Sequence, residues 1–174
     1  MKIKDDKNKF KGLSNIKNAS TWFDVLKSDD RSAVLISCAA FDAKLERILD
    51  NSFKSGVSKK VVNQFAKRID LCFELGLISK QVQSELHALR EIRNAFAHNI
   101  FGCSFENPDV LNELKKVKSA ELAGASFNEP RIYFHTAVLI LDNALETVIQ
   151  QNSASDAQQI VQEGFATRGI FTMR

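Results

Sequence analysis

The residues with the clearest chemical potential form the run Arg93-Asn94-Ala95-Phe96-Ala97-His98. Arginine is always charged, and its planar guanidinium suits two-pronged binding of a phosphate group. Histidine can take or give a proton near neutral pH. A ribonuclease that works without a metal needs such a group at the 2′-hydroxyl or the leaving oxygen, together with a cation that stabilises the phosphorane. Arg93 and His98 are the candidate catalytic residues for this chemistry, with Asn94 to orient them.

The spacing of these residues sets a geometric condition. On a helix, Asn94 and His98 are four residues apart and share one side, whereas Arg93 and His98 are separated by about 140° around the axis. Arg93 and His98 can therefore meet only across a cleft, either between helices or between two protomers. A structural role is the alternative, because arginine and histidine near a helix C-terminus bond the last carbonyl groups and interact favourably with the helix dipole.

Apolar residues recur at helical spacing along most of the chain. They predict helices at residues 20–27, 31–53, 59–75, from 80 through the run itself, at 108–118 and at 130–151, with a short helix at 156–162. The expected N-caps are Asp30, Ser58, Ser79 and Asn107. Gly76 fits the left-handed position that follows a helix, and residues 119–129 are expected to form a loop.

Two apolar stripes indicate the core. The clearest amphipathic helix is the one that carries the run, with Val82, Leu86, Leu89, Ile92 and Phe96 on one side. The last long helix shows a heptad rhythm at Phe134, Val138, Leu141, Leu145 and Val148. Such a seam is typical either of a core or of a partner surface, and we expect core.

The composition is that of an all-α protein. A length of 174 residues is typical of one domain, and two prolines and seven glycines are too few for the frequent turns of a β-sandwich or barrel. We expect a compact bundle of five to seven helices at residues 18–152. A flexible basic tail at 1–17 should precede it, and a C-terminal extension at 153–174 should follow.

No cofactor or metal is expected. The chain has no Walker loop, dinucleotide-binding glycine motif or zinc-protease motif, and His87, His98 and His135 lack the spacing of a metal site. Three cysteines without a CxxC pair argue against a disulfide framework or a zinc site. The polar N-terminus is unlike a signal peptide, and no apolar run reaches the ~18 residues of a membrane span. We therefore expect a cytoplasmic protein without a membrane partner.

Specific binding to duplex DNA is not expected either. Residues 1–17 hold six lysines and two aspartates, so with a net charge of +3 for the whole chain the body is close to neutral. A dedicated DNA binder usually has a basic face. In a helix-turn-helix at 65–89, turning at Gly76-Leu77-Ile78, the second helix would carry a full apolar stripe and offer only Lys80 as a nearby basic residue. An ordinary helical hairpin is the preferred interpretation, and the tail alone can touch phosphates.

The run resembles the signature of the HEPN superfamily, in which four to six residues separate an arginine from a histidine. Asn94 fits the polar residue that commonly follows the arginine in active members. The resemblance implies a helical and often dimeric domain. Many HEPN proteins are metal-independent ribonucleases of toxin, CRISPR and antiphage systems, and others are not catalytic.

A longer stretch, roughly residues 30–110, looks like the mannitol operon repressor family. The segments that carry this resemblance are Arg31-Ser32-Ala33-Val34-Leu35-Ile36, Arg68-Ile69-Asp70-Leu71, Leu75-Gly76-Leu77-Ile78-Ser79, Leu89 to His98, and Ser104-Phe105. The resemblance implies an all-α fold and a role in regulating transcription.

Two functions from different classes follow from these resemblances. The first is a regulatory protein that controls gene expression chiefly through contacts with a protein partner. The alternative is an HEPN-type endoribonuclease, a toxin or antiphage effector that cleaves RNA with Arg93, Asn94 and His98 and has an antitoxin as its possible partner. The breadth of resemblance favours the first, the intact motif favours the second, and we expect a homodimer.

Overall fold

The computed structural model of this chain describes residues 19–53, 64–99 and 102–169, with side chains described between Trp22 and Asn152. The described residues form seven α-helices and no strand, which confirms the predicted all-α bundle. The helices are α1 (Ala19–Lys27), α2 (Asp30–Ser52), α3 (Phe65–Glu74), α4 (Lys80–His98), α5 (Pro108–Leu114), α6 (Lys118–Leu122) and α7 (Pro130–Gly169). The tail expected at residues 1–17 lies outside the described residues.

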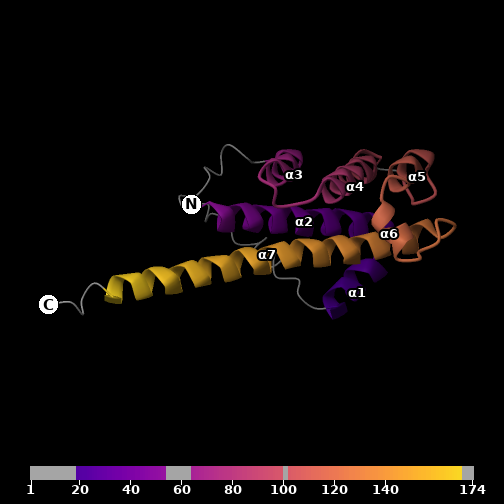
Figure 1. The fold of residues 1–174 in the computed structure, drawn as a ribbon. Helices are drawn as coiled ribbons and strands as arrows, with labels where there is room; N and C mark the ends of the chain where they lie inside the picture. The colour runs from indigo at the N-terminus through magenta and orange to yellow at the C-terminus, as the bar shows by residue number, and fades with distance from the viewer. Residues whose placement is uncertain (1–18, 54–63, 100–101, 170–174) are drawn as a thin grey trace, which may run out of the picture.

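Helix α2 occupies the centre of the bundle (Figure 1). It packs against α7 on one side and against α3 and α4 on the other, while α1 lies against α2, α5 against α4 and α6 against α7. Arg31 at the start of α2 bonds to Asn99 just after α4, and further along Cys38 bonds to Leu89. The two helices are therefore antiparallel, and the motif-bearing end of α4 lies beside the first turns of α2.

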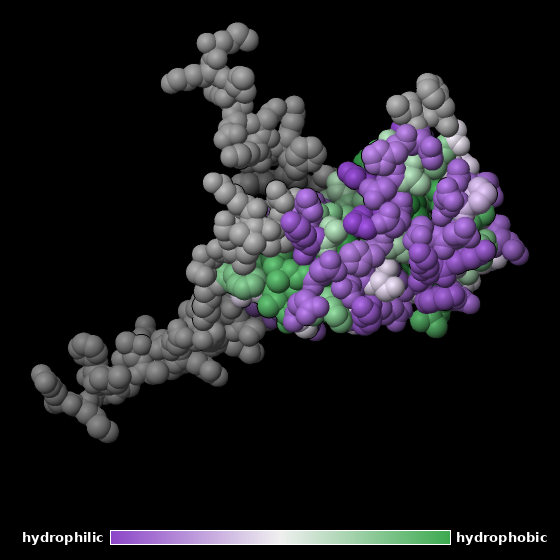
Figure 2. Space-filling view, turned by 90° about the horizontal axis from the view of Figure 1, so that it is seen from above, coloured by the Kyte–Doolittle hydropathy of each residue, from purple (hydrophilic) through white to green (hydrophobic). Residues whose placement is uncertain are grey.

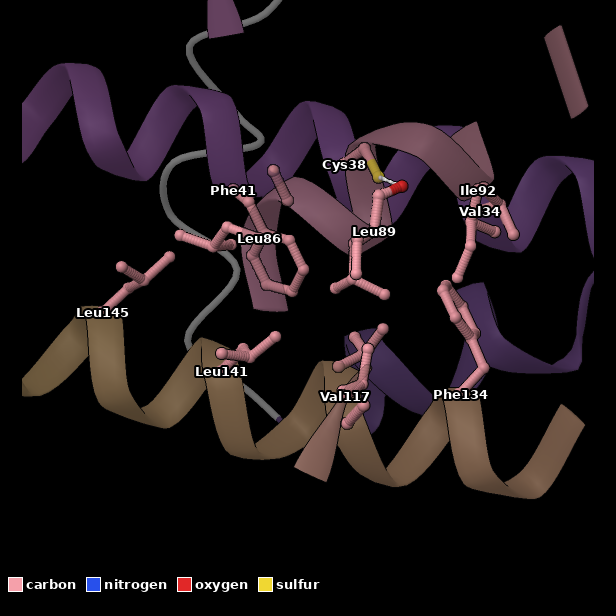
Figure 3. Close-up of a cluster of buried hydrophobic side chains, with 14 of the residues drawn as sticks. Val34, Cys38, Phe41, Leu86, Leu89, Ile92, Val117, Phe134, Leu141 and Leu145 are labelled. Atoms are coloured by element: carbon pink, nitrogen blue, oxygen red, sulfur yellow. Dashed lines mark hydrogen bonds between the residues drawn. The ribbon is translucent and has the colours of Figure 1, made fainter. Parts of the chain in front are cut away.

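The core lies where α2, α4 and α7 meet (Figure 3). Most residues of the two predicted apolar stripes are buried there, namely Leu86, Leu89, Ile92, Phe96, Phe134, Val138, Leu141 and Leu145. Helix α2 adds Val34, Cys38, Phe41, Leu45, Ile48 and Leu49, all of them buried. Val82 and Val148 are partly buried against the same cluster. The heptad seam of α7 is therefore core, as expected.

One charged side chain lies inside this core. Lys44 of α2 is fully buried, and its ammonium lies 2.7 Å from a carboxylate oxygen of Asp142 and 3.3 Å from one of Glu146, both on α7. Because an unpaired buried charge costs several kcal/mol, this pairing favours one register of α7 against α2. The apolar pattern of the sequence did not indicate it.

Capping residues set several helix starts. Ser79 and Asn107 accept backbone hydrogen bonds at the starts of α4 and α5, as predicted. Gly76 follows α3 with a φ of +69°, in the left-handed region that the prediction required. The predicted cap Asp30 is wrong, because Asp29 has the extended backbone and accepts the capping hydrogen bond.

Helix α3 starts later than predicted. Gln64 has an extended backbone, with φ −117° and ψ 138°, so the helix begins at Phe65 and not at residue 59. Residues 54–63, which include the expected cap Ser58, lie outside the described residues.

The helix predicted at 108–118 is also wrong in part. It ends at Leu114, and a short helix, α6, occupies part of the segment expected to be a loop. The buried carboxylate of Glu85 on α4 accepts hydrogen bonds from the backbone N–H of Lys118 (3.0 Å) and of Ser119 (2.9 Å). Glu85 thus caps α6 from a distant part of the chain, which local spacing cannot reveal.

Helix α7 is longer than predicted. It runs without a break to Gly169, so the separate helix expected at 156–162 is part of it, and its last turns project beyond the other helices (Figure 1). The segment Pro130–Asn152, with a mean hydropathy of 1.3, is long and apolar enough to cross a membrane by length and composition alone. The apolar pattern of the sequence did not predict such a segment. It also supplies Phe134 and Leu141 to the core.

Replacing Phe96 tests the packing beneath the motif. Phe96 is fully buried, and its ring centroid lies 5.4 Å from that of Phe105. Phe96→Ala leaves a cavity, so the free energy of unfolding should fall by ~3–5 kcal/mol in urea denaturation. A denaturation midpoint equal to that of the wild type would contradict the burial of this ring.

Candidate functional site

The three predicted site residues lie in the last turns of α4. The apolar stripe of this helix turns Ile92 and Phe96 into the core, which leaves the residues between and after them towards the surface. Arg93 and His98 are exposed, and Asn94 is half-buried. One side of α4 therefore packs in the core, and the polar residues of the motif lie on the other sides of the helix.

Arg93 and Asn94 line a surface cleft of about 620 Å³ between α2, the start of α3 and α4. Its walls include Leu35 and Asp42 of α2, Phe65 of α3, and Arg90, Arg93 and Asn94 of α4. Figure 2 views the molecule from the side on which α3, α4 and α5 lie, and shows mainly hydrophilic residues there.

The arginines give this cleft a surplus of positive charge. The carboxylate of Asp42 lies 2.6 Å from the guanidinium of Arg68, which compensates it. Arg90 is paired with an acidic neighbour on α4. Arg93 donates a hydrogen bond to the uncharged side chain of Asn94 at 3.3 Å, and among the described residues it forms no ion pair.

Asn94 connects Arg93 to the rest of α4. Its amide oxygen accepts the hydrogen bond from Arg93, and its amide nitrogen donates to a carboxylate oxygen of Glu91 at 3.4 Å. An exposed guanidinium held from one side by a neutral group keeps most of its donors free for a ligand. Charge-assisted hydrogen bonds to phosphate are the strongest that such a group can make.

His98 does not line the cleft. It is the last residue of α4, one turn beyond Asn94, and within the described part of the chain its ring has no hydrogen-bond partner. The carbonyl of the next residue, Asn99, accepts a hydrogen bond from Arg31 of α2. One chain therefore brings Arg93 and Asn94 together but not His98. Arg31, and not Arg93 or His98, donates to this carbonyl just past the end of α4.

Cys38 also lines the cleft, but it is not a nucleophile at neutral pH. Burial raises the pKa of its thiol to about 12, although the charge of Arg93 acts in the opposite direction. The thiolate is the reactive form of cysteine, and the Cys38 thiol is instead hydrogen-bonded to the carbonyl of Leu89 (Figure 3).

The other histidine of α4 has a different environment. The ring of His87 lies 2.8 Å from the carboxylate of Asp70 on α3, and this hydrogen bond lowers the pKa of Asp70. His87 does not line the cleft. Across the described ranges, no group of three or more His, Cys, Asp or Glu residues is placed to hold a metal ion.

Sequence reasoning missed several residues of this site. Arg90 precedes Arg93 by three residues, so helical spacing alone signals that their side chains are neighbours. Phe65, Asp42 and Arg31 come from other helices and reach α4 only through tertiary packing. No local pattern in the sequence indicates them.

Comparison of the chain with protein-family models, with curated proteins and with solved structures found no match. The resemblances to the HEPN superfamily and to the mannitol operon repressor family therefore rest on the residues quoted above.

Thiol labelling tests the closed core below the cleft. Burial raises the pKa values of Cys38 and Cys72 to about 12 each, whereas Cys103 is partly exposed. A thiol reagent at neutral pH should therefore modify Cys103 first and the other two only after unfolding in urea, as followed by mass spectrometry. Fast modification of Cys38 in the native protein would show that solvent reaches the floor of the cleft.

Proposed function

We propose that this chain is a metal-independent endoribonuclease that uses Arg93, Asn94 and His98. One observation carries the proposal: Arg93 and His98 lie on the exposed side of α4, away from the hydrophobic core, and Arg93 has no ion-pair partner among the described residues. Polar residues kept for stability are usually paired or help to cap a helix. Arg93 and His98 are instead exposed and open to a ligand, and their chemistry suits a phosphodiester.

In the proposed reaction, the 2′-hydroxyl of a ribose attacks the adjacent phosphorus. The O2′–P bond forms while the P–O5′ bond breaks, leaving a 2′,3′-cyclic phosphate on one product and a 5′-hydroxyl on the other. His98 accepts the proton of the 2′-hydroxyl, and the leaving O5′ takes a proton from water. Arg93, oriented by Asn94, donates to the non-bridging oxygens, where negative charge develops in the transition state.

A second copy of the chain completes the proposed site. His98 does not line the cleft that holds Arg93, and the two residues lie about 140° apart around the helix. When two copies of the motif face each other across a two-fold axis, Arg93 of one protomer and His98 of its partner can reach the same phosphate. The expected homodimer is therefore part of the proposal.

A regulatory protein acting through protein contacts is the second candidate. It is favoured by large apolar side chains exposed on α1 and α7: Phe23 is 59% exposed, Ile132 50% and Leu139 45%. Ile132 and Leu139 are two turns apart and share one side of α7. Exposed apolar patches often mark protein interaction sites. A regulatory protein of this kind would not need Arg93, Asn94 or His98.

His98→Ala should abolish RNA cleavage and leave the melting temperature and the oligomeric state unchanged. The exposed ring contributes proton transfer and little packing, and loss of such a group slows catalysis by roughly 10²–10⁴. Cleavage of a labelled RNA, circular dichroism and size-exclusion chromatography provide the readouts. The matched control is His87→Ala, which removes the other histidine of α4 and should cleave at the wild-type rate.

Arg93→Lys is the second variant of this test. It keeps the charge but removes the planar donor pair that binds two phosphate oxygens, so cleavage should also fall. If His98→Ala and Arg93→Lys both cleave as the wild type does, the ribonuclease proposal is wrong and the regulatory function is favoured.

A further inference from the structure

The cleft beside Arg93 contains a second arginine and an aromatic ring that the cleavage chemistry does not itself require. We propose that this cleft is a binding subsite for one unpaired nucleotide, with its phosphate on Arg90 and Arg93 and its base against Phe65. This inference rests on the proposed ribonuclease function, and it specifies how the RNA next to the cleaved bond is held.

Arg90 supplies the second cation. It lies one turn before Arg93 on α4, and both side chains line the cleft. One terminal nitrogen of Arg90 is paired with Glu91, whereas its Nε is buried and has no hydrogen-bond partner. The side chain as a whole is 32% exposed and lines the cleft, so its guanidinium can also donate a charge-assisted hydrogen bond to a phosphate oxygen bound there.

The remaining charges of the cleft do not oppose an anion. Its carboxylate, Asp42, is compensated by Arg68 at 2.6 Å. The thiol of Cys38 is neutral near pH 7, because burial raises its pKa. The charge of Arg90 is balanced by Glu91, whereas Arg93 forms no ion pair among the described residues, so one positive charge of the cleft is uncompensated. Arginine side chains as close as these two are typical of phosphate recognition.

The opposite part of the cleft suits a nucleobase. Phe65, the first residue of α3, is half-buried and lines the cleft together with Leu35 and Ala39 of α2. Bases of single-stranded RNA stack on aromatic rings. Gln64 also lines the cleft, and its side chain makes no capping hydrogen bond, so its amide can bond the edge of a base.

Size and shape favour one unpaired nucleotide over a duplex. A cleft of about 620 Å³ lies within the ~300–1,000 Å³ that is typical of small-ligand sites. The bases of an A-form duplex are stacked and paired, so a base must be splayed out before it can reach Phe65. The subsite should therefore select loops, bulges or single strands.

The test measures binding separately from cleavage. The probe is a fluorescent single-stranded oligoribonucleotide with a 2′-O-methyl group on every ribose, which removes the attacking hydroxyl. Binding to the full chain is followed by anisotropy at a salt concentration high enough to suppress contacts of the lysine-rich tail. Arg90→Ala and Phe65→Leu should each weaken binding about tenfold, as expected for loss of a stacked base or a phosphate contact.

A matched control and a second probe identify the two halves of the subsite. Lys116→Ala removes one exposed positive charge outside the cleft and should bind as the wild type does. An oligomer of the same length with abasic residues should lose affinity on Arg90→Ala but not on Phe65→Leu. Melting temperatures show whether each variant remains folded.

The outcomes distinguish this inference from the proposed function. Wild-type affinity in Arg90→Ala and Phe65→Leu, equal competition by duplex RNA, or no binding by the wild type overturns the subsite. If RNA is still cleaved in that case, the ribonuclease function stands without it. If the probe binds through Arg90 and Phe65 while no RNA is cleaved, the subsite stands and the ribonuclease function fails.

Discussion

The burial of α2 along its length is the constraint on which the rest of the molecule depends. Val34, Phe41, Leu45 and Ile48 are fully buried between α4 on one side and α7 on the other. The ammonium of Lys44 adds a directional element, because it has two carboxylate partners on α7. Sliding α2 past either neighbour would expose apolar surface and separate a buried ion pair. Burial of apolar surface is worth roughly 25 cal/mol per Å², so such a shift is costly.

This constraint also defines the site. Helices α2 and α4, which form two walls of the cleft, pack directly against each other, and Arg31 joins the start of α2 to the residue after α4. Sites built on packed helices hold their side chains more precisely than sites on loops. The position of each motif residue around the helix decides its environment. Phe96 faces the core, whereas Arg93 and Asn94 face the cleft.

Much of the fold could be predicted because it follows from local patterns. The apolar spacing identified α1, α2 and α4 and most of the core, and the caps Ser79 and Asn107 were found from residue type alone. The predictions that failed concern helices whose ends depend on contacts with distant residues or are not marked by a glycine or proline. Helix α6 depends on a cap supplied by Glu85 from another helix, and no glycine or proline lies between Pro130 and residue 163 to mark an earlier end of α7.

In the candidate site, too, local features could be predicted from the sequence and long-range contacts could not. Arg93, Asn94 and His98 were identified from residue type and spacing, and the angle between Arg93 and His98 correctly anticipated that one helix face cannot hold both. The cleft itself could not be foreseen, because Phe65 and Asp42 enter it from separate helices. Asp142 and Glu146, the half-buried partners of Lys44, were missed for a related reason: acidic residues on a helix normally indicate its solvent-exposed face.

We propose that this chain cleaves RNA with its own side chains and without a metal. The most direct test of this proposal incubates the purified full-length protein with total RNA, in the presence and absence of EDTA, and determines the chemistry of the new ends. We expect cleavage at an equal rate in both conditions, with 2′,3′-cyclic phosphate and 5′-hydroxyl termini. Intact RNA in both samples, or cleavage that disappears with EDTA, would contradict it.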